Sequence, residues 1–162
     1  EVMKPFIGLG PSIMDCQKMT DVKQAKMMFP QPALPQVVPL NSVTMIHAVL
    51  ENIAYAARGN FEQLEAHQKS SCIKTIGGMT QSNLWPNLLA NIIGQPVHTP
   101  MQPEGSLLGA AICAAKGAGH YETLMDAAKN MVQWKPVSEP DDRANLYNSY
   151  YSKWKSMWCE GE

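Results

Sequence analysis

The sequence predicts an α/β fold that is rich in helix and has few parallel strands. Two short strand-like runs alternate with amphipathic segments of helical length, so that each strand is followed by a helix. Helical crossovers of this kind join parallel strands, whereas antiparallel strands need only a short turn. A chain of 162 residues is long enough for one domain with a hydrophobic core. We therefore expect a single domain over 1–162, with an irregular opening segment at 1–40 and an α/β core at 41–160.

The opening segment is rich in proline, which lacks a backbone N–H and fixes φ, so we expect extended segments and turns there rather than long helices. Its prolines are Pro5, Pro11, Pro30, Pro32, Pro35 and Pro39. The rest of the sequence supplies only two clear strands, which make a thin sheet for the helices that cover it. Either the opening segment supplies more strands, or the remaining strands lie in chain outside this sequence.

The first helix is predicted over residues 42–66, with a bend near Gly59. Apolar residues recur there at steps of three and four, which is the spacing of one helix face. They are Ile46, Val49, Leu50, Ile53, Ala57, Phe61 and Leu64. Ser42, at the start of this pattern, is a residue type that caps helices.

A strand is predicted at residues 71–76, because the run SCIKTI is short, contains β-branched residues and is followed by Gly77-Gly78. The next helix is predicted over 82–93. It starts at a serine or an asparagine, either of which can cap it, and it ends before Gly94, which is a typical helix terminator.

The remaining elements are shorter. A second strand is predicted at residues 97–98, followed by an Ala- and Gly-rich helix from Glu104 to about Gly117. Two amphipathic helices are predicted near 121–132 and 142–157, and the proline-containing run WKPVSEPD between them reads as a loop.

Composition excludes several functional classes. The formal net charge is −1 and the 13 Lys and Arg are spread along the chain, which argues against a nucleic acid partner. Polar residues, Pro and Gly interrupt the apolar stretches before the roughly 20 residues that a membrane span needs. Four widely spaced cysteines without a CxxC pair indicate reduced thiols rather than a zinc site. We expect a soluble, cytoplasmic protein, and because the sequence opens on Glu1 rather than on methionine, we expect further chain upstream.

The glycine pair Gly77-Gly78 is the first candidate binding site. It follows a strand and precedes a helix, whose free N–H groups and positive dipole end face the sheet edge where α/β proteins bind ligands. A base or a ribose can approach a backbone without side chains closely, and a polar run follows, namely Thr80, Gln81, Ser82 and Asn83. The alternative is a turn that needs a positive φ, because the sequence has neither GxGxxG nor a Walker lysine at this point.

The second candidate is the small-residue helix EGSLLGAAICAAKGAG at 104–119. Its glycines and alanines allow a helix to pack closely on a sheet or beside a nucleotide pocket. Close packing alone is the favoured interpretation of that composition.

The run IGGMTQSNLWPNLLANIIGQPVHTPMQPEGSLLGAAICAAKGAG at 76–119 resembles the carboxy-terminal nucleotide-binding domain of FGGY carbohydrate kinases. The matching elements are Gly77-Gly78, Ala90-Asn91, Pro96-Val97, Glu104 and Gly109-Ala110-Ala111. Three further segments resemble the family: PFIGLGPSIMD at 5–15, SVTMIHAVLENIAY at 42–55, where Ala48, Leu50 and Glu51 match, and YNSYYSKW at 147–154. The resemblance thus extends over most of the chain.

This resemblance implies an actin-like, ribonuclease-H-like ATPase fold and a parent enzyme that transfers the γ-phosphate of ATP, with Mg²⁺, to a sugar or polyol hydroxyl. In the family the catalytic aspartate and the sugar pocket belong to the amino-terminal half. No catalytic residue is therefore assigned to this chain, which we expect to be inactive alone. The adenine side of the nucleotide site is implied at Gly77, Gly78, Met79, Gln81, Ser82 and Asn83.

Three positions depart from the family pattern: Ser82 stands where asparagine is common, with Asn83 beside it, and His47 and Asn91 replace arginine and aspartate. The competing hypothesis is a non-catalytic dimerisation or scaffolding module derived from the kinase lobe, and nucleotide affinity would separate the two. Exposed apolar surface on such a lobe also predicts a homo-oligomer. A Rossmann-type site is disfavoured, because no acidic residue lies about 20 positions beyond the glycines to hold a ribose.

Overall fold

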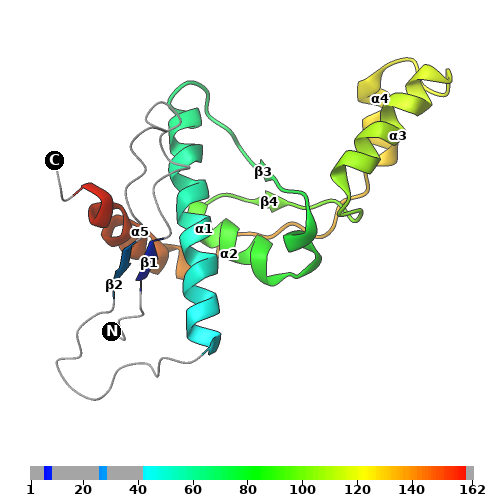
Figure 1. The fold of residues 1–162 in the computed structure, drawn as a ribbon. Helices are drawn as coiled ribbons and strands as arrows, with labels where there is room; N and C mark the ends of the chain where they lie inside the picture. The colour runs from blue at the N-terminus through cyan, green and yellow to red at the C-terminus, as the bar shows by residue number, and fades with distance from the viewer. Residues whose placement is uncertain (1–5, 9–25, 29–41, 160–162) are drawn as a thin grey trace. The chain divides into compact units, whose positions relative to one another are not determined.

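The computed structural model describes residues 6–8, 26–28 and 42–159 (Figure 1). The chain divides into two compact units, one of Glu1–Ser70 with Asp142–Glu162 and one of Ser71–Asp141. The first contains β1 (Phe6–Gly8), β2 (Lys26–Met28), α1 (Ser42–Glu65) and α5 (Arg143–Cys159). The second contains the remaining strands and helices. That residues 1–162 act as one domain stays a prediction.

The opening segment does supply strands. β1 and β2 pair antiparallel, with Phe6 opposite Met28, and form a two-stranded sheet separate from the pair in the second unit. They therefore do not widen the parallel sheet. The rest of the segment that resembles the family at 5–15 lies outside the described residues.

The helix predicted at 42–66 is α1, but its buried face differs from the predicted one. Ile46 and Leu64 are 62% and 68% exposed, whereas the polar residues Glu51 and Asn52 are buried. On this face α1 packs against helix α5, whose Trp154 is hydrogen-bonded to Asn52 and lies beside the ring of Tyr55. Apolar periodicity thus located the helix but not its packed face.

Trp154 on α5 is the centre of the first unit. It is 1% exposed, and its indole Nε1–H donates a hydrogen bond to Asn52 Oδ1 on α1 at 3.0 Å. Its ring stacks on Tyr151 with centroids 5.9 Å apart and lies 5.8 Å from the ring of Tyr55. Packing of these aromatic rings, together with the hydrogen bond of the indole N–H, therefore joins α1 to α5.

Glu62 on α1 links the same two helices at their half-exposed rim. Its carboxylate accepts hydrogen bonds from Arg58 Nε at 3.0 Å and from Tyr151 Oη at 2.9 Å, and it lies 3.4 Å from Lys155 Nζ. Burial raises the pKa of this carboxyl, but the bonds from Tyr151 and Arg58 and the charges of Lys155 and Arg58 outweigh burial and hold the pKa below its usual value. Burial and the same bond raise the pKa of the Tyr151 phenol.

Acid is therefore expected to weaken the first unit through Glu62. A carboxyl whose pKa is depressed by folding stabilises the folded state above its unfolded pKa of 4.5, and this contribution is lost as the pH falls through the folded pKa. Because the side chain is 39% exposed, the effect should stay below about 1 kcal/mol. Urea unfolding of the wild-type chain and of Glu62→Gln, followed by circular dichroism between about pH 6 and pH 3, would measure the difference. Parallel pH profiles for the two proteins would contradict it.

The second unit is built on β3 (Ile73–Lys74) and β4 (Val97–His98), which are parallel, with Ile73 opposite Val97. α2 (Leu84–Ile93) is the crossover between them. The predicted parallel pair and its crossover helix are confirmed, although the first strand is shorter than the predicted 71–76.

A third backbone segment pairs with β4, and the sequence did not predict this sheet partner. The tail segment, residues 132–141, runs antiparallel to β4 and its extension, with bridges Val97↔Ser138 and Pro100↔Trp134. Val97 and Ser138 exchange N–H···O bonds of 2.9 and 3.0 Å. Pro136 and Pro140 within this run made it read as a loop, yet the two bridges form at Trp134 and Ser138, which are not prolines.

α2 starts and ends as the sequence predicts. Ser82 Oγ accepts a hydrogen bond from Leu84 N–H at 3.1 Å, so the serine, not Asn83, caps the helix with its side chain. At the other end Gly94 adopts φ 78° and its N–H donates to Ala90 O at 2.8 Å. A left-handed glycine of this kind satisfies a helix terminus without strain.

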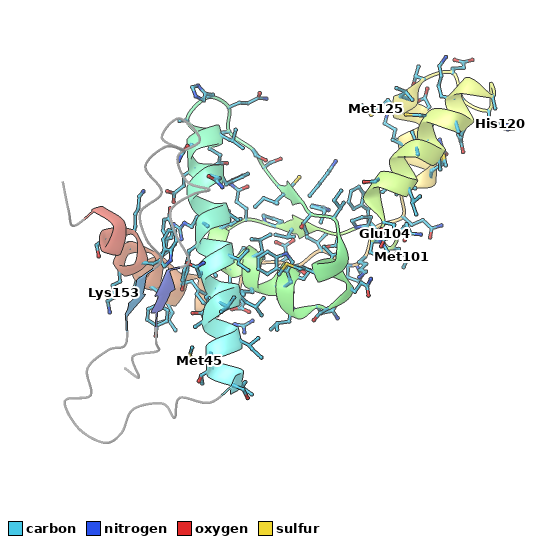
Figure 2. All side chains as sticks on the ribbon, viewed as in Figure 1. Met45, Met101, Glu104, His120, Met125 and Lys153 are labelled. Atoms are coloured by element: carbon cyan, nitrogen blue, oxygen red, sulfur yellow. The ribbon has the colours of Figure 1, made fainter. Side chains whose placement is uncertain are left out.

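The predicted helices at 104–117 and 121–132 are α3 (Gly105–Gly117) and α4 (Leu124–Met131), which form a helical hairpin. Figure 2 labels Glu104 before α3 and His120 between the two helices. No residue of α3 is buried among the described residues, so its small side chains do not pack on the parallel strands. The described helices include none long and apolar enough to cross a membrane.

Candidate functional site

The glycine pair forms a sharp turn after β3. Gly77 has φ 106° and ψ 176°, a conformation that residues with a Cβ rarely adopt, whereas Gly78 has a negative φ. A one-turn 3₁₀ helix, η2 (Gly78–Gln81), then separates this turn from α2. The need for a positive φ is confirmed at Gly77 alone, and η2 is an element that the sequence did not predict between the glycines and α2.

Hydrogen bonds hold the turn in place from three directions. Gly77 N–H donates to Pro103 O at 3.1 Å, and the buried Thr80 donates to Gly77 O from its backbone N–H at 3.0 Å and its hydroxyl at 2.7 Å. Lys135 Nζ, on the tail segment, donates to Thr80 O at 2.7 Å. The turn is therefore fixed before any ligand arrives.

The outer side of this turn is open. An added Cβ at either Gly77 or Gly78 would meet no heavy atom of the described chain within 4 Å. The next candidates, Met79, Gln81, Ser82 and Asn83, are all exposed. The predicted site residues thus lie on one exposed side of the stretch from Gly77 to Asn83, which the buried Thr80 anchors to the interior of the unit.

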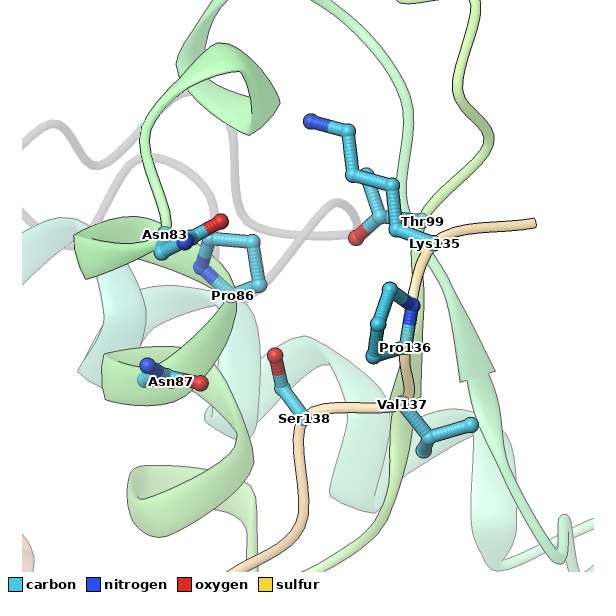
Figure 3. A pocket seen from close by; sticks show the side chains of 8 residues that line it. All are labelled: Asn83, Pro86, Asn87, Thr99, Lys135, Pro136, Val137 and Ser138. Carbon is cyan, nitrogen blue, oxygen red and sulfur yellow. The ribbon is translucent and has the colours of Figure 1, made fainter.

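A cavity of about 190 Å³ lies between α2 and the tail segment (Figure 3). It is lined by Asn83, Pro86, Asn87, Thr99, Lys135, Pro136, Val137 and Ser138. Of the predicted site residues, only Asn83 contributes to its wall. The sequence offered no signal for Lys135 or Thr99, because the pairing of β4 with the tail segment brings them together.

The described residues contain no group of three His, Cys, Asp or Glu side chains able to hold a metal ion. The arrangement instead offers exposed backbone, amide side chains and the positive end of α2. Such groups can hold a flat polar ring and bind its edge, but they supply neither a general base nor a metal ligand set.

Comparison with protein families matches residues 23–118 to the C-terminal domain of the FGGY family of carbohydrate kinases. Autoinducer-2 kinase of Escherichia coli K12 is 30% identical over 121 residues, which cover 73% of this chain and 23% of that protein. The enzyme of the same name from Yersinia enterocolitica is 30% identical over 123 residues, covering 74% and 23%. The chain spans about a quarter of the length of these curated relatives.

Solved structures share the fold. Plasmodium falciparum glycerol kinase with ADP matches with a TM-score of 0.70 at 18% identity, over 94% of this chain and 30% of that one. Xylulose kinase from Lactobacillus acidophilus matches with a TM-score of 0.67 at 20% identity, over 83% and 26%. The predicted actin-like, ribonuclease-H-like α/β fold, rich in helix with few parallel strands, is confirmed.

Proposed function

This chain belongs to the FGGY family of carbohydrate kinases, in which it matches the carboxy-terminal domain, and we propose that it forms the adenine side of a nucleotide site. The parent enzyme would transfer the γ-phosphate of ATP to a sugar or polyol hydroxyl. Relatives named for autoinducer-2, xylulose and glycerol support this substrate class. The glycerol kinase structure contains ADP, which supports ATP as the phosphoryl donor.

The open glycine turn is the observation that carries this proposal. Backbone at Gly77, Gly78 and Met79 would lie against the face of the base, since no side chain at the glycines holds it away. The exposed amides of Gln81 and Asn83 would bind the polar edge. Ser82 Oγ already accepts a bond from Leu84 N–H, but its O–H can still donate to a ring nitrogen.

The chemistry itself is assigned to other parts of the parent. No aspartate here lies in a matching catalytic motif, so a base that accepts the sugar hydroxyl proton and the ligands of Mg²⁺ would come from the amino-terminal half. This chain would contribute binding and orientation, which raise the rate only when both halves close on the substrates. Its net charge of −1 argues against a nucleic acid partner, and we propose that the parent enzyme is cytoplasmic.

The second candidate function is a dimerisation or scaffolding module. The exposed α3, where Leu107 is 68% exposed, favours it, because such apolar surface is usually covered by another chain or domain. A homo-oligomer would follow from this use of α3.

Adenosine binding to the 162-residue chain tests the proposal. With only the adenine side present, we expect adenosine and ADP to bind about equally, with Kd on the order of 1 mM, and to shift the amide resonances of 77–83. Gln81→Ala should weaken binding severalfold, whereas Gln133→Ala, an exposed glutamine on the tail segment, should not. No sugar-dependent ADP formation is expected. Absence of any adenosine-induced shift would favour the scaffolding function. Sugar-dependent ADP formation by the chain alone would contradict the assignment of the catalytic groups to the amino-terminal half.

A further inference from the structure

We propose that the cavity between α2 and the tail segment binds a small oxyanion, either inorganic phosphate or the carboxylate of a small acid. This site shares Asn83 with the adenine site proposed above, but its other lining residues are separate and it does not depend on that proposal. Only its effect on nucleotide binding, considered below, rests on the proposed function.

The charge of the cavity wall favours an anion. Lys135 is the one charged residue among those that line the cavity, and no acidic side chain lines it. The first turn of α2 contributes Pro86 and Asn87 to the wall, so the partial positive charge at the start of this helix lies near the same space. A volume of about 190 Å³ holds an oxyanion and a few waters, since one water takes about 30 Å³ of liquid.

Thr99 provides an independent observation. It is 3% exposed, and among the described residues no hydrogen-bond partner reaches its Oγ1. A buried hydroxyl without a partner destabilises the fold, and few such groups occur without a role. In Figure 3 this hydroxyl points into the cavity, between Pro86 and Pro136. An anion oxygen there would accept its proton and satisfy it.

Lys135 is also held in position for this role. Its backbone N–H donates to Thr99 O at 2.9 Å, which fixes the two residues side by side across the β4 pairing. Its Nζ gives one N–H to Thr80 O at 2.7 Å, and an ammonium group has three. The remaining donors are available to a ligand, together with the amides of Asn83 and Asn87 and the Ser138 hydroxyl.

The same lysine connects the cavity to the glycine turn. Lys135 holds Thr80 O, and Thr80 in turn donates twice to Gly77 O. An anion that draws the ammonium toward Thr99 would weaken its bond to Thr80 and loosen the turn. Phosphate is therefore expected to lower adenosine affinity.

Titration of the ¹⁵N-labelled 162-residue chain with inorganic phosphate tests the site. The expected result is a saturable shift of the amides of Thr99, Lys135 and Asn87, with Kd on the order of 1 mM, and no such shift with chloride at equal ionic strength. Acetate and malonate in place of phosphate distinguish a carboxylate ligand from a phosphate ligand. If none of these anions shifts those amides, the proposal is overturned.

Two variants separate the site from general stability. Thr99→Val keeps the shape but removes the hydroxyl, so it should raise the thermal unfolding midpoint and weaken phosphate binding about tenfold. Lys135→Gln should weaken binding at least as much, whereas Lys129→Gln on α4 should not. Unchanged phosphate affinity in Thr99→Val would refute the site. In the wild-type chain, adenosine shifts without phosphate shifts would refute this inference alone, and phosphate shifts without adenosine shifts would refute only the proposed adenine site.

Discussion

Replacing Trp154 with alanine is expected to unfold the first unit or to leave it barely stable. The indole is buried against Tyr151 and Tyr55, and its N–H is bonded to Asn52. Removing such a ring from a core costs about 3–5 kcal/mol, which is a large part of the stability of a small domain. Urea unfolding followed by far-ultraviolet circular dichroism should show an earlier midpoint or the loss of a distinct transition.

Two further variants show whether the ring itself is responsible. Trp154→Phe keeps an aromatic ring but loses the bond to Asn52, so we expect an intermediate loss. Lys153→Ala changes the exposed neighbour on the same helix turn and should stay within about 0.5 kcal/mol of the wild type (Figure 2). A Trp154→Ala protein with the wild-type midpoint would show that α1 and α5 are held together by other contacts.

Gly77→Ala is expected to have the second largest effect, on both stability and nucleotide binding. There is room for the methyl group, but a φ of 106° with an extended ψ is costly for any residue with a Cβ, by about 1–3 kcal/mol. The turn should shift to relieve this strain, and the adenosine-induced shifts at 77–83 should weaken about tenfold.

Gly78→Ala is the matched control, because its φ is negative and its surroundings are equally open. Its stability should stay close to that of the wild type. If a base lies against this backbone, however, the new methyl group should still weaken adenosine binding. Equal adenosine affinity in Gly78→Ala and the wild type would argue that the base does not approach the second glycine.

Local sequence chemistry determined most of the elements in the second unit. The capping serine, the terminating Gly94 and the β-branched run before Gly77 act on their immediate neighbours, so α2, β3 and β4 could be predicted. The exposed candidate stretch at 77–83 could be identified from the glycine pair and the polar residues that follow it. That it contacts a base stays a prediction.

What the sequence could not predict depends on residues far apart in the chain. Lys135 reaches Thr80 because the tail segment pairs with β4, and no local pattern marks a run that contains prolines as a sheet partner. The packed face of α1 was likewise set by Trp154, which lies 102 positions beyond Asn52. Burial of polar Asn52 and exposure of Ile46 follow from that partner and contradict simple periodicity.

The pairing of β4 with the tail segment has an architectural consequence. The chain leaves this backbone ladder after Met101 and rejoins it at Gln133, where Met101 N–H still donates to Gln133 O at 2.8 Å. Residues 102–132, which include the α3–α4 hairpin, therefore form an insertion whose two ends lie side by side. Relatives can lengthen, shorten or replace this insertion at the modest entropic cost of closing a loop. The register of the pairing between β4 and the tail segment would be preserved. The hydrogen bond from Lys135 to Thr80 would be preserved with it.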